Sequence, residues 1–164
     1  MNVTLRLVEL EDAVYVQQYA SDARVAVTTF VPHPYPAGAG ESWARMVIAR
    51  REQGISCVFS IWAEERFAGI VSLNGLNGEE RSAEMDYWIA VPYWNRGIGT
   101  EATKQAIGYA AGPLRLTTLR SACLARNAGS SRVLLKNGFR QIGEFTFPEG
   151  KFAGERGYRY ELNL

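Results

Sequence analysis

The chain contains two cysteines and one histidine among its 164 residues. Cys57 and Cys123 lie far apart and form no CxxC pair, so a metal site of the usual ligand spacing is not expected. We expect both cysteines to be reduced residues of the core and the protein to need no metal. His33 stands between Pro32 and Pro34, and because prolines remove backbone donors, we assign it to an exposed loop.

An excess of charge and a long hydrophobic run are also missing. The formal net charge is +1, whereas a general nucleic-acid binder is usually more basic, so no nucleic-acid partner is expected. No stretch approaches the roughly 20 apolar residues of a membrane span. The acidic residues Glu9, Glu11 and Asp12 near the start are unlike a secretory signal. Together these absences predict a cytoplasmic protein without a membrane partner.

Hydrophobic residues make up 47% of the chain, and its length is that of one domain, so we expect residues 1–164 to form a single domain with one core. Alternation, helical periodicity and turn residues predict the order of elements. Strands are expected at 3–8, 56–63, 67–76, 83–91, 114–123, 139–147 and 153–162, and helices at 9–19, 41–54, 98–111 and 127–137. The run from 56 to 91 predicts an antiparallel meander, and the helix after it predicts a crossover to a parallel strand.

The most informative segment is Pro92–Ala102, in which a strand runs into two glycines and the start of a helix. Gly97 and Gly99 let the backbone approach a ligand without an intervening Cβ atom. The first amides of a helix have no intrahelical acceptor, and they favour an anion together with the charge of Arg96. The segment therefore predicts a site for a diphosphate group.

Other glycine-loop sites fit this segment less well. Gly97 to Ala102 matches the pattern G-x-G-x-x-A of dinucleotide sites, but the glycines do not directly follow an early strand. The next strand also carries Arg120 where such sites have an acidic residue, roughly 20 residues after the glycines. A P-loop requires a lysine after its last glycine, and here Thr100 follows Gly99. The alternative that the glycines only shape a tight turn remains open.

Two motifs resemble the Gcn5-related N-acetyltransferase (GNAT) family. Trp94-Asn95-Arg96-Gly97-Ile98-Gly99 is similar to the family's acetyl-CoA loop, Q/R-x-x-G-x-G/A, apart from its first position. Asn127-Ala128-Gly129-Ser130 and the later Lys136-Asn137-Gly138-Phe139 are similar to the N-x-x-S helix and its K-x-G-F end in the RimJ/RimL-like subgroup. The resemblance covers most of the chain, including the order of its elements.

The resemblance implies a single α/β domain with a mixed, mainly antiparallel sheet of about seven strands, helices on both faces, and a splayed parallel pair that receives the pantetheine arm. Acetyl-CoA is the implied cosubstrate. Its implied contacts are Ile89, Ala90 and Val91 on the strand, Arg96, Gly97, Ile98, Gly99 and Thr100 in the loop, and Asn127, Arg132 and Lys136 on the later helix. For Asn127 a helix cap alone is an equal alternative, and the two basic residues on that helix are open to a purely solvated role.

Acetyl transfer needs a neutral amine, so a base or a water chain has to remove a proton. Alternation between residues 83 and 91 places Glu84, Asp86 and Trp88 on one face of a strand, where the carboxylates would orient or deprotonate the amine. Solvated carboxylates or salt bridges are the alternative. The resemblance assigns Ser130 to the departing thiolate, and a first-turn helix residue without a catalytic role is an equal alternative. Tyr158 and Tyr160 are weaker candidates. It also points to Glu84 as the base, although Asp86 stands where the subgroup usually has glycine.

We expect the acceptor pocket to draw on Tyr35, Trp43 and Trp88. The subgroup resemblance implies a protein N-terminal amine as acceptor, with a small amine such as an amino acid, polyamine or aminoglycoside as the alternative. Neither cysteine has a recognisable nucleophile setting, so direct attack in a ternary complex is expected. A non-catalytic acyl-CoA-binding sensor is the alternative of another class, and the protein is expected to be a monomer or a homodimer.

Overall fold

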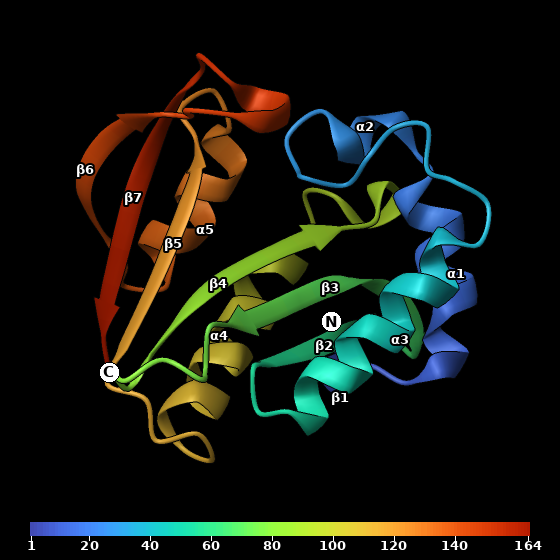
Figure 1. Cartoon of the computed structure of the whole chain (residues 1–164). Coiled ribbons are helices and arrows are strands. Elements are labelled where there is room, and N and C mark those ends of the chain that lie inside the picture. The colour runs from blue at the N-terminus through green and yellow to red at the C-terminus, as the bar shows by residue number, and fades with distance from the viewer.

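A seven-stranded mixed sheet organises the fold, and the computed structural model describes residues 1–164 (Figure 1). The strand order is β1-β2-β3-β4-β5-β7-β6. The strands are β1 (Val3–Leu7), β2 (Ser56–Ala63), β3 (Arg66–Asn74), β4 (Ser82–Ile89), β5 (Thr118–Leu124), β6 (Arg140–Thr146) and β7 (Arg156–Asn163). Only β4 and β5 pair in parallel, which confirms the predicted mainly antiparallel sheet.

Helices cover both faces of this sheet (Figure 1). The helices are α1 (Ala13–Ala20), α2 (Ala23–Ala26), α3 (Ala39–Glu52), α4 (Ile98–Ala111) and α5 (Ala128–Lys136). Buried hydrophobic residues form one cluster beneath α4 and a smaller one beneath α1 and α3. Two clusters replace the single core expected from the length, because a sheet covered on both faces has two interfaces to bury. None of the helices combines the length and hydrophobicity that crossing a bilayer requires.

Several boundaries differ from the predicted ones. The first helix begins as a short 3-10 turn, Leu10–Asp12, before α1, and the sequence pattern did not indicate α2. Helix α3 begins earlier than expected, because Gly38 precedes it in the left-handed region with φ 79°. Strand β4 ends at Ile89, so Ala90 lies beyond the strand and Val91 begins a second 3-10 turn.

The parallel strands β4 and β5 stay paired over a short distance only. Their register joins Ser82 with Thr118, Ala83 with Leu119 and Glu84 with Arg120, and the strands then separate. Just beyond the last pair, the Ser121 hydroxyl donates to the Met85 carbonyl oxygen at 2.7 Å. Because this carbonyl is satisfied by a side chain instead of the neighbouring strand, the separation leaves no buried unpaired group at its start. The predicted splayed pair is confirmed.

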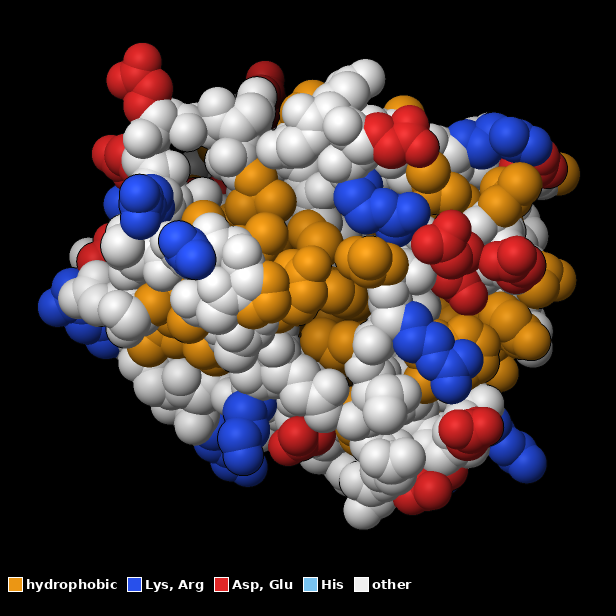
Figure 2. Space-filling view, turned by 90° about the horizontal axis from the view of Figure 1, so that it is seen from below, with side chains coloured by type: hydrophobic (Ala, Val, Ile, Leu, Met, Phe, Trp, Pro, Cys, Tyr) orange, Lys and Arg blue, Asp and Glu red, His pale blue; other side chains and the backbone are white.

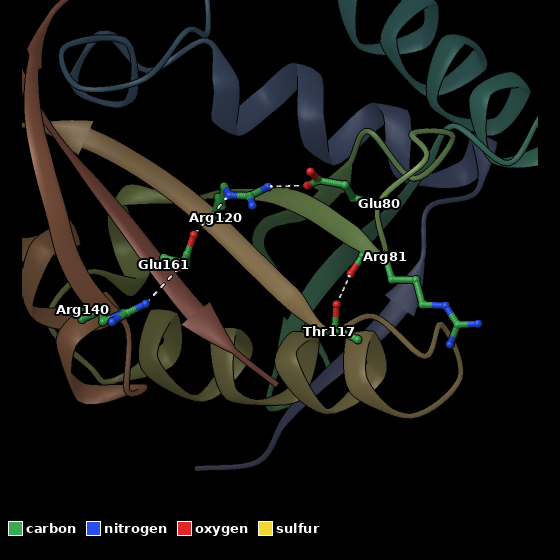
Figure 3. Close-up of polar contacts among 6 residues, drawn as sticks. All are labelled: Glu80, Arg81, Thr117, Arg120, Arg140 and Glu161. Atoms are coloured by element: carbon green, nitrogen blue, oxygen red, sulfur yellow. Dashed lines mark hydrogen bonds and ion pairs between the residues drawn. The ribbon is translucent and has the colours of Figure 1, made fainter.

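Ion pairs hold the closed end of this gap (Figure 3). The Arg120 guanidinium on β5 lies between two carboxylates, 3.4 Å from Glu80 and 3.3 Å from Glu161 on β7. Arg140 on β6 contacts the other oxygen of Glu161 at 3.1 Å. Exposed pairs of this kind contribute at most about 1 kcal/mol each, but the shared carboxylate links three strands. The network ties the C-terminal strands together at the end where β4 and β5 meet.

The surface at this same end carries a second hollow of about 490 Å³. Figure 2 shows apolar side chains gathered on this face of the molecule. The hollow is lined mainly by Leu7, Leu76, Tyr109, Leu114 and Leu116. Burial raises the pKa of the Cys57 thiol at its base, which keeps that thiol protonated at neutral pH. The hollow has no cluster of catalytic groups, and the candidate site lies at the opposite end of β4.

Candidate active site

A cavity of about 1080 Å³ opens where β4 and β5 separate. It brings together segments that are distant in the sequence, from α1 and α3 to the connection between β6 and β7. Most of the site residues expected from the sequence line it: Tyr35, Trp43, Glu84, Asp86, Trp88, Ile89, Arg96, Gly97, Ile98, Gly99, Thr100, Asn127, Ser130, Arg132 and Lys136. Ala90 and Val91 are not among its lining residues.

One wall is formed by the loop between β4 and α4, whose amides are free. No backbone amide from Asn95 to Thr100 donates to a protein acceptor, and the first helical bond runs from the Glu101 amide to the Gly97 carbonyl at 3.1 Å. Gly97 caps the helix with φ 75°, and Asn95 also has a positive φ of 60°. These consecutive amides around a helix N-terminus are unpaired donors in a loop that lines the cavity, which suits an anion.

The two glycines of this loop serve different purposes. A Cβ atom on Gly97 would meet nothing within 4 Å, so its role is conformational. A Cβ atom on Gly99 would lie 3.3 Å from the Tyr87 ring, so this glycine makes room for that ring. The Trp94 indole donates to the Ile89 carbonyl oxygen at 2.7 Å and fixes the loop to the end of β4. The turn-only alternative therefore explains Gly97 in part, but it does not account for the free amides.

The backbone of β4 presents alternate residues to the gap. The Ala90 amide donates to the Ala68 carbonyl oxygen at 2.7 Å, and hydrogen-bonded pairs alternate along an antiparallel ladder. The amides of Tyr87 and Ile89 consequently point away from β3, toward β5. The structure thus presents Ile89 to the gap, whereas Ala90 uses its amide within the sheet and Val91 lies in the following turn. Of Ile89 and Ala90, only Ile89 keeps an amide without a partner in the sheet.

Charged side chains divide this cavity into two parts. Its only charged lining residues are Glu84 and Asp86 on β4 and Arg96, Arg132 and Lys136 on the side of α4 and α5. The acidic residues share the sheet face of α1 and α3 with Trp88, as the predicted alternation requires. The basic part suits phosphate groups and the acidic part suits a cation.

Asp86 is the most perturbed carboxylate of the site. Water reaches it through the cavity mouth, yet protein surrounds it on most sides, and this desolvation raises its pKa to about 6. The nearby Glu84 carboxylate raises the pKa further, while a hydrogen bond from Ser72 opposes the rise. The Asn74 side chain also donates to Asp86 at 3.4 Å. Near neutral pH Asp86 is thus an ionised carboxylate that can accept a proton.

Ser130 lies at the first turn of α5, close to the gap. The Asn127 side chain accepts from the Ser130 amide at 3.1 Å, so Asn127 is the helix cap, and it also lines the cavity. Burial raises the pKa of the Tyr87 hydroxyl, and a hydrogen bond with Ser130 partly offsets this rise. Tyr158 and Tyr160 do not line the cavity, and the Tyr160 hydroxyl is bonded to Ser131. Of these three residues, only Ser130 lines the cavity.

Sequence reasoning missed Tyr87 and three phenylalanines of the cavity. Tyr87 alternates with the carboxylates, so the period-two pattern places it on the opposite face of the strand. Phe30, Phe147 and Phe152 come from two segments far apart in the sequence, and their rings lie together, with centroids 5.3 Å apart for Phe30 and Phe152. No local pattern indicates such a contact, because it depends on how the two ends of the chain meet.

Sequence comparison provides an independent result. Residues 2–140 match the family model described as an acetyltransferase (GNAT) domain. A ribosomal-protein-serine acetyltransferase of Escherichia coli K12 is 30% identical over 90 residues, which cover 54% of this chain and 49% of that protein. An uncharacterized N-acetyltransferase, p20, of Bacillus licheniformis is 27% identical over 143 residues, which cover 86% of this chain and 80% of that protein. The chain spans about half the length of the first two curated relatives it matches, 49% and 59%.

Solved structures show the same fold. RimL, a ribosomal α-N-protein acetyltransferase in complex with coenzyme A, superposes with a TM-score of 0.91 at 15% identity, covering 100% of this chain and 95% of that one. Spermidine N-acetyltransferase of Vibrio cholerae in complex with coenzyme A and spermine gives a TM-score of 0.83 at 19% identity, covering 98% and 95%. The family match over most of the chain, together with this fold and the splayed pair beside a glycine loop, shows that the protein belongs to the GNAT acetyltransferase family.

Proposed function

We propose that the protein transfers an acetyl group from acetyl-CoA to a primary amine. The observation that carries this proposal is the row of free amides from Asn95 to Thr100, which stands beside the open end of the β4–β5 gap. A diphosphate at these amides leaves the pantetheine arm next to the free backbone groups of Tyr87 and Ile89. The thioester then lies between the basic and the acidic parts of the cavity.

The basic residues have separate tasks in this arrangement. The amides of Arg96, Gly97, Ile98, Gly99 and Thr100 bind the diphosphate, and the Arg96 guanidinium adds a full charge at the same edge. The remaining residues that contact acetyl-CoA are Ile89, Asn127, Arg132 and Lys136. Because Arg132 and Lys136 lie on α5, they are placed for the more distant phosphate of the adenosine end.

The chemistry follows from the acidic part of the cavity. Asp86, assisted by Glu84, orients the ammonium group and takes its proton directly or through water. The neutral nitrogen attacks the thioester carbonyl, and the Ile89 amide stabilises the oxyanion that forms. The C–S bond then breaks, the nitrogen gives up its second proton to solvent, and the thiolate accepts a proton from the Ser130 hydroxyl, which regains one from solvent. The products are the N-acetylated amine and free coenzyme A, and no acyl-enzyme forms.

Replacing Ser130 by alanine tests the proton donor. We expect kcat to fall by about tenfold or more, because a positioned acid typically contributes at least that much, while acetyl-CoA affinity stays unchanged. Ser131→Ala is the matched control, since this neighbouring hydroxyl contacts Tyr160 in the core and faces away from the thioester. Equal kcat values for the parent and the Ser130 variant, measured by coenzyme A release, would remove Ser130 from the mechanism.

The proposed activity is tested by combining a binding and a turnover measurement. Calorimetry is expected to show acetyl-CoA binding, and coenzyme A is expected to appear only when an amine is added. The leading acceptor is a protein N-terminal amine, and a small amine is the alternative, so the panel includes peptides with free N-termini, amino acid amides and polyamines. Tight binding of acetyl-CoA without turnover of any amine would favour a non-catalytic acyl-CoA sensor.

A further inference from the structure

The acidic part of the cavity contains two carboxylates and no other charged side chain. Apart from Glu84 and Asp86, no charged side chain lines the part that faces α1, α3 and the β6–β7 connection. Its walls are aromatic: Phe30, Tyr35, Trp43, Trp88, Phe147 and Phe152. The carboxylates lie on β4, and the phenylalanines come from the segment after α2 and from the connection between β6 and β7. A ligand in this part therefore meets one site for a positive charge and a large apolar surface.

The mouth exposes an aromatic ring to water. Phe30 keeps 70% of its surface exposed, although its ring contacts both Phe147 and Phe152. Phe147 and Phe152 also contact each other, with centroids 5.8 Å apart. The three rings form one apolar cluster from two segments of the chain, which we call the rim, and in it Phe30 is exposed whereas Phe152 is buried. Such a rim around a cavity is typical of a surface that an apolar group covers on binding.

The basic side chains near the mouth are occupied by the protein. The Lys151 ammonium donates to the carbonyl oxygens of Thr29 and Val31, each at 2.7 Å. The Arg126 guanidinium contacts Glu155 at 2.7 Å and donates to the Val27 carbonyl at 3.0 Å. Neither cation is left to bind a carboxylate of a substrate. These contacts also join the connection between β6 and β7 to the segment after α2.

We propose that the acceptor is a monocationic primary amine carried on an aromatic or branched apolar group, without a carboxylate beside the amine. This inference rests on the proposed acetyl transfer. The ammonium group pairs with Asp86 and Glu84, and the apolar group packs against the aromatic walls. A free amino acid would bring its carboxylate toward these acids with no cation to receive it. A polyamine would place its second charge among aromatic side chains that offer it no carboxylate.

A panel of five acceptors tests this substrate class with the wild-type chain. L-phenylalaninamide is expected to exceed L-alaninamide by about 100-fold in kcat/KM, since even one methylene in an apolar pocket changes this ratio by tenfold or more. Free L-phenylalanine and spermidine are expected to fall below phenylalaninamide by at least about tenfold. The fifth acceptor is phenethylamine. Phenylalaninamide well above phenethylamine indicates the N-terminal residue of a peptide as source, and the reverse order indicates a free arylalkylamine.

The variant Phe30→Ser tests the rim, and because Phe30 is 70% exposed, the substitution leaves the packed core intact. It is expected to reduce the preference for phenylalaninamide over alaninamide by about fivefold or more, with acetyl-CoA affinity unchanged in calorimetry. Val27→Ser is the matched control, because Val27 lies in the same segment, is 54% exposed and does not line the cavity.

The outcomes separate this inference from the activity itself. Equal kcat/KM for both amides, or spermidine as the best acceptor, overturns the substrate class and leaves acetyl transfer standing. An unchanged preference in Phe30→Ser overturns the role of the rim. Turnover of no amine, despite binding of acetyl-CoA, overturns the proposed activity and the substrate class with it.

Discussion

Gly97→Glu is expected to weaken acetyl-CoA binding by at least about 100-fold, which corresponds to about 2.7 kcal/mol. The new carboxylate would stand among the free amides from Asn95 to Thr100, where it would take their hydrogen bonds and repel the diphosphate. The left-handed backbone at this residue, with φ 75°, adds a conformational cost of about 1–2 kcal/mol to folding. Isothermal titration with acetyl-CoA measures the change in affinity.

A second glycine provides the control for that conformational cost. Gly75 has φ 74°, and a Cβ atom there would also meet nothing within 4 Å. It lies between β3 and β4 at the end of the sheet opposite the cavity, so Gly75→Glu introduces the same strain and charge without touching the loop. We expect this variant to lose stability as Gly97→Glu does but to bind acetyl-CoA normally. Unchanged affinity in Gly97→Glu would contradict the assignment of the loop to the diphosphate.

Asp86→Asn is expected to lower kcat/KM by about 100-fold, because the positioned base is lost while the shape of the side chain is kept. The pKa of Asp86 is about 6, so kcat/KM of the parent should rise with pH through this value, and the variant should lack that limb. Glu84→Gln serves as comparison and is expected to have a smaller effect, since Glu84 lies at the closed end of the gap beside Arg120. A parent-like pH profile in Asp86→Asn would exclude Asp86 as the base.

The same substitution should increase stability. Folding raises the pKa of Asp86 from 3.8 to about 6, so the folded state holds this proton more tightly than the unfolded state. The resulting stabilisation is complete below pH 3.8 and is lost as the pH rises through 6. Asp86→Asn should therefore melt a few degrees higher than the parent at pH 8, with the difference shrinking toward pH 4. A lower melting temperature at pH 8 would indicate that the ionised carboxylate stabilises the fold.

Much of the fold could be predicted because its signals are local. The glycine loop, the alternation from residue 83 to 89 and the Asn127 cap each depend on neighbouring residues, and the structure shows all of them. The end of β4 was less accessible, because Ala90 continues the apolar run although the chain turns after Ile89. Where a strand ends depends on its partner strand. Here the last hydrogen bond to β3 runs from the Ala90 amide to the Ala68 carbonyl oxygen.

The acceptor part of the site was less predictable, for a physical reason. Tyr87 faces the gap only because β5 separates from β4. The residues of β4 alone do not predict that separation. Phe30 meets Phe152 across more than half of the chain, so neither residue's neighbours reveal the contact. The charges in the sequence do not predict the bonds of Lys151 either, because its partners are backbone carbonyls. Local chemistry thus predicted the loop of free amides, whereas long-range packing forms the aromatic walls of the cavity.

The bonds from Lys151 and Arg126 to the segment after α2 have a consequence for how ligands come and go. Strand pairing joins β4 and β5 at one end of the gap. At the other end, these bonds join the loops on its two sides, so protein spans both ends of the gap. We expect coenzyme A to thread it from the side of α4 and the amine to arrive from the opposite side. Each product can then leave from its own side of the gap, independently of the other product and without separation of any paired strands.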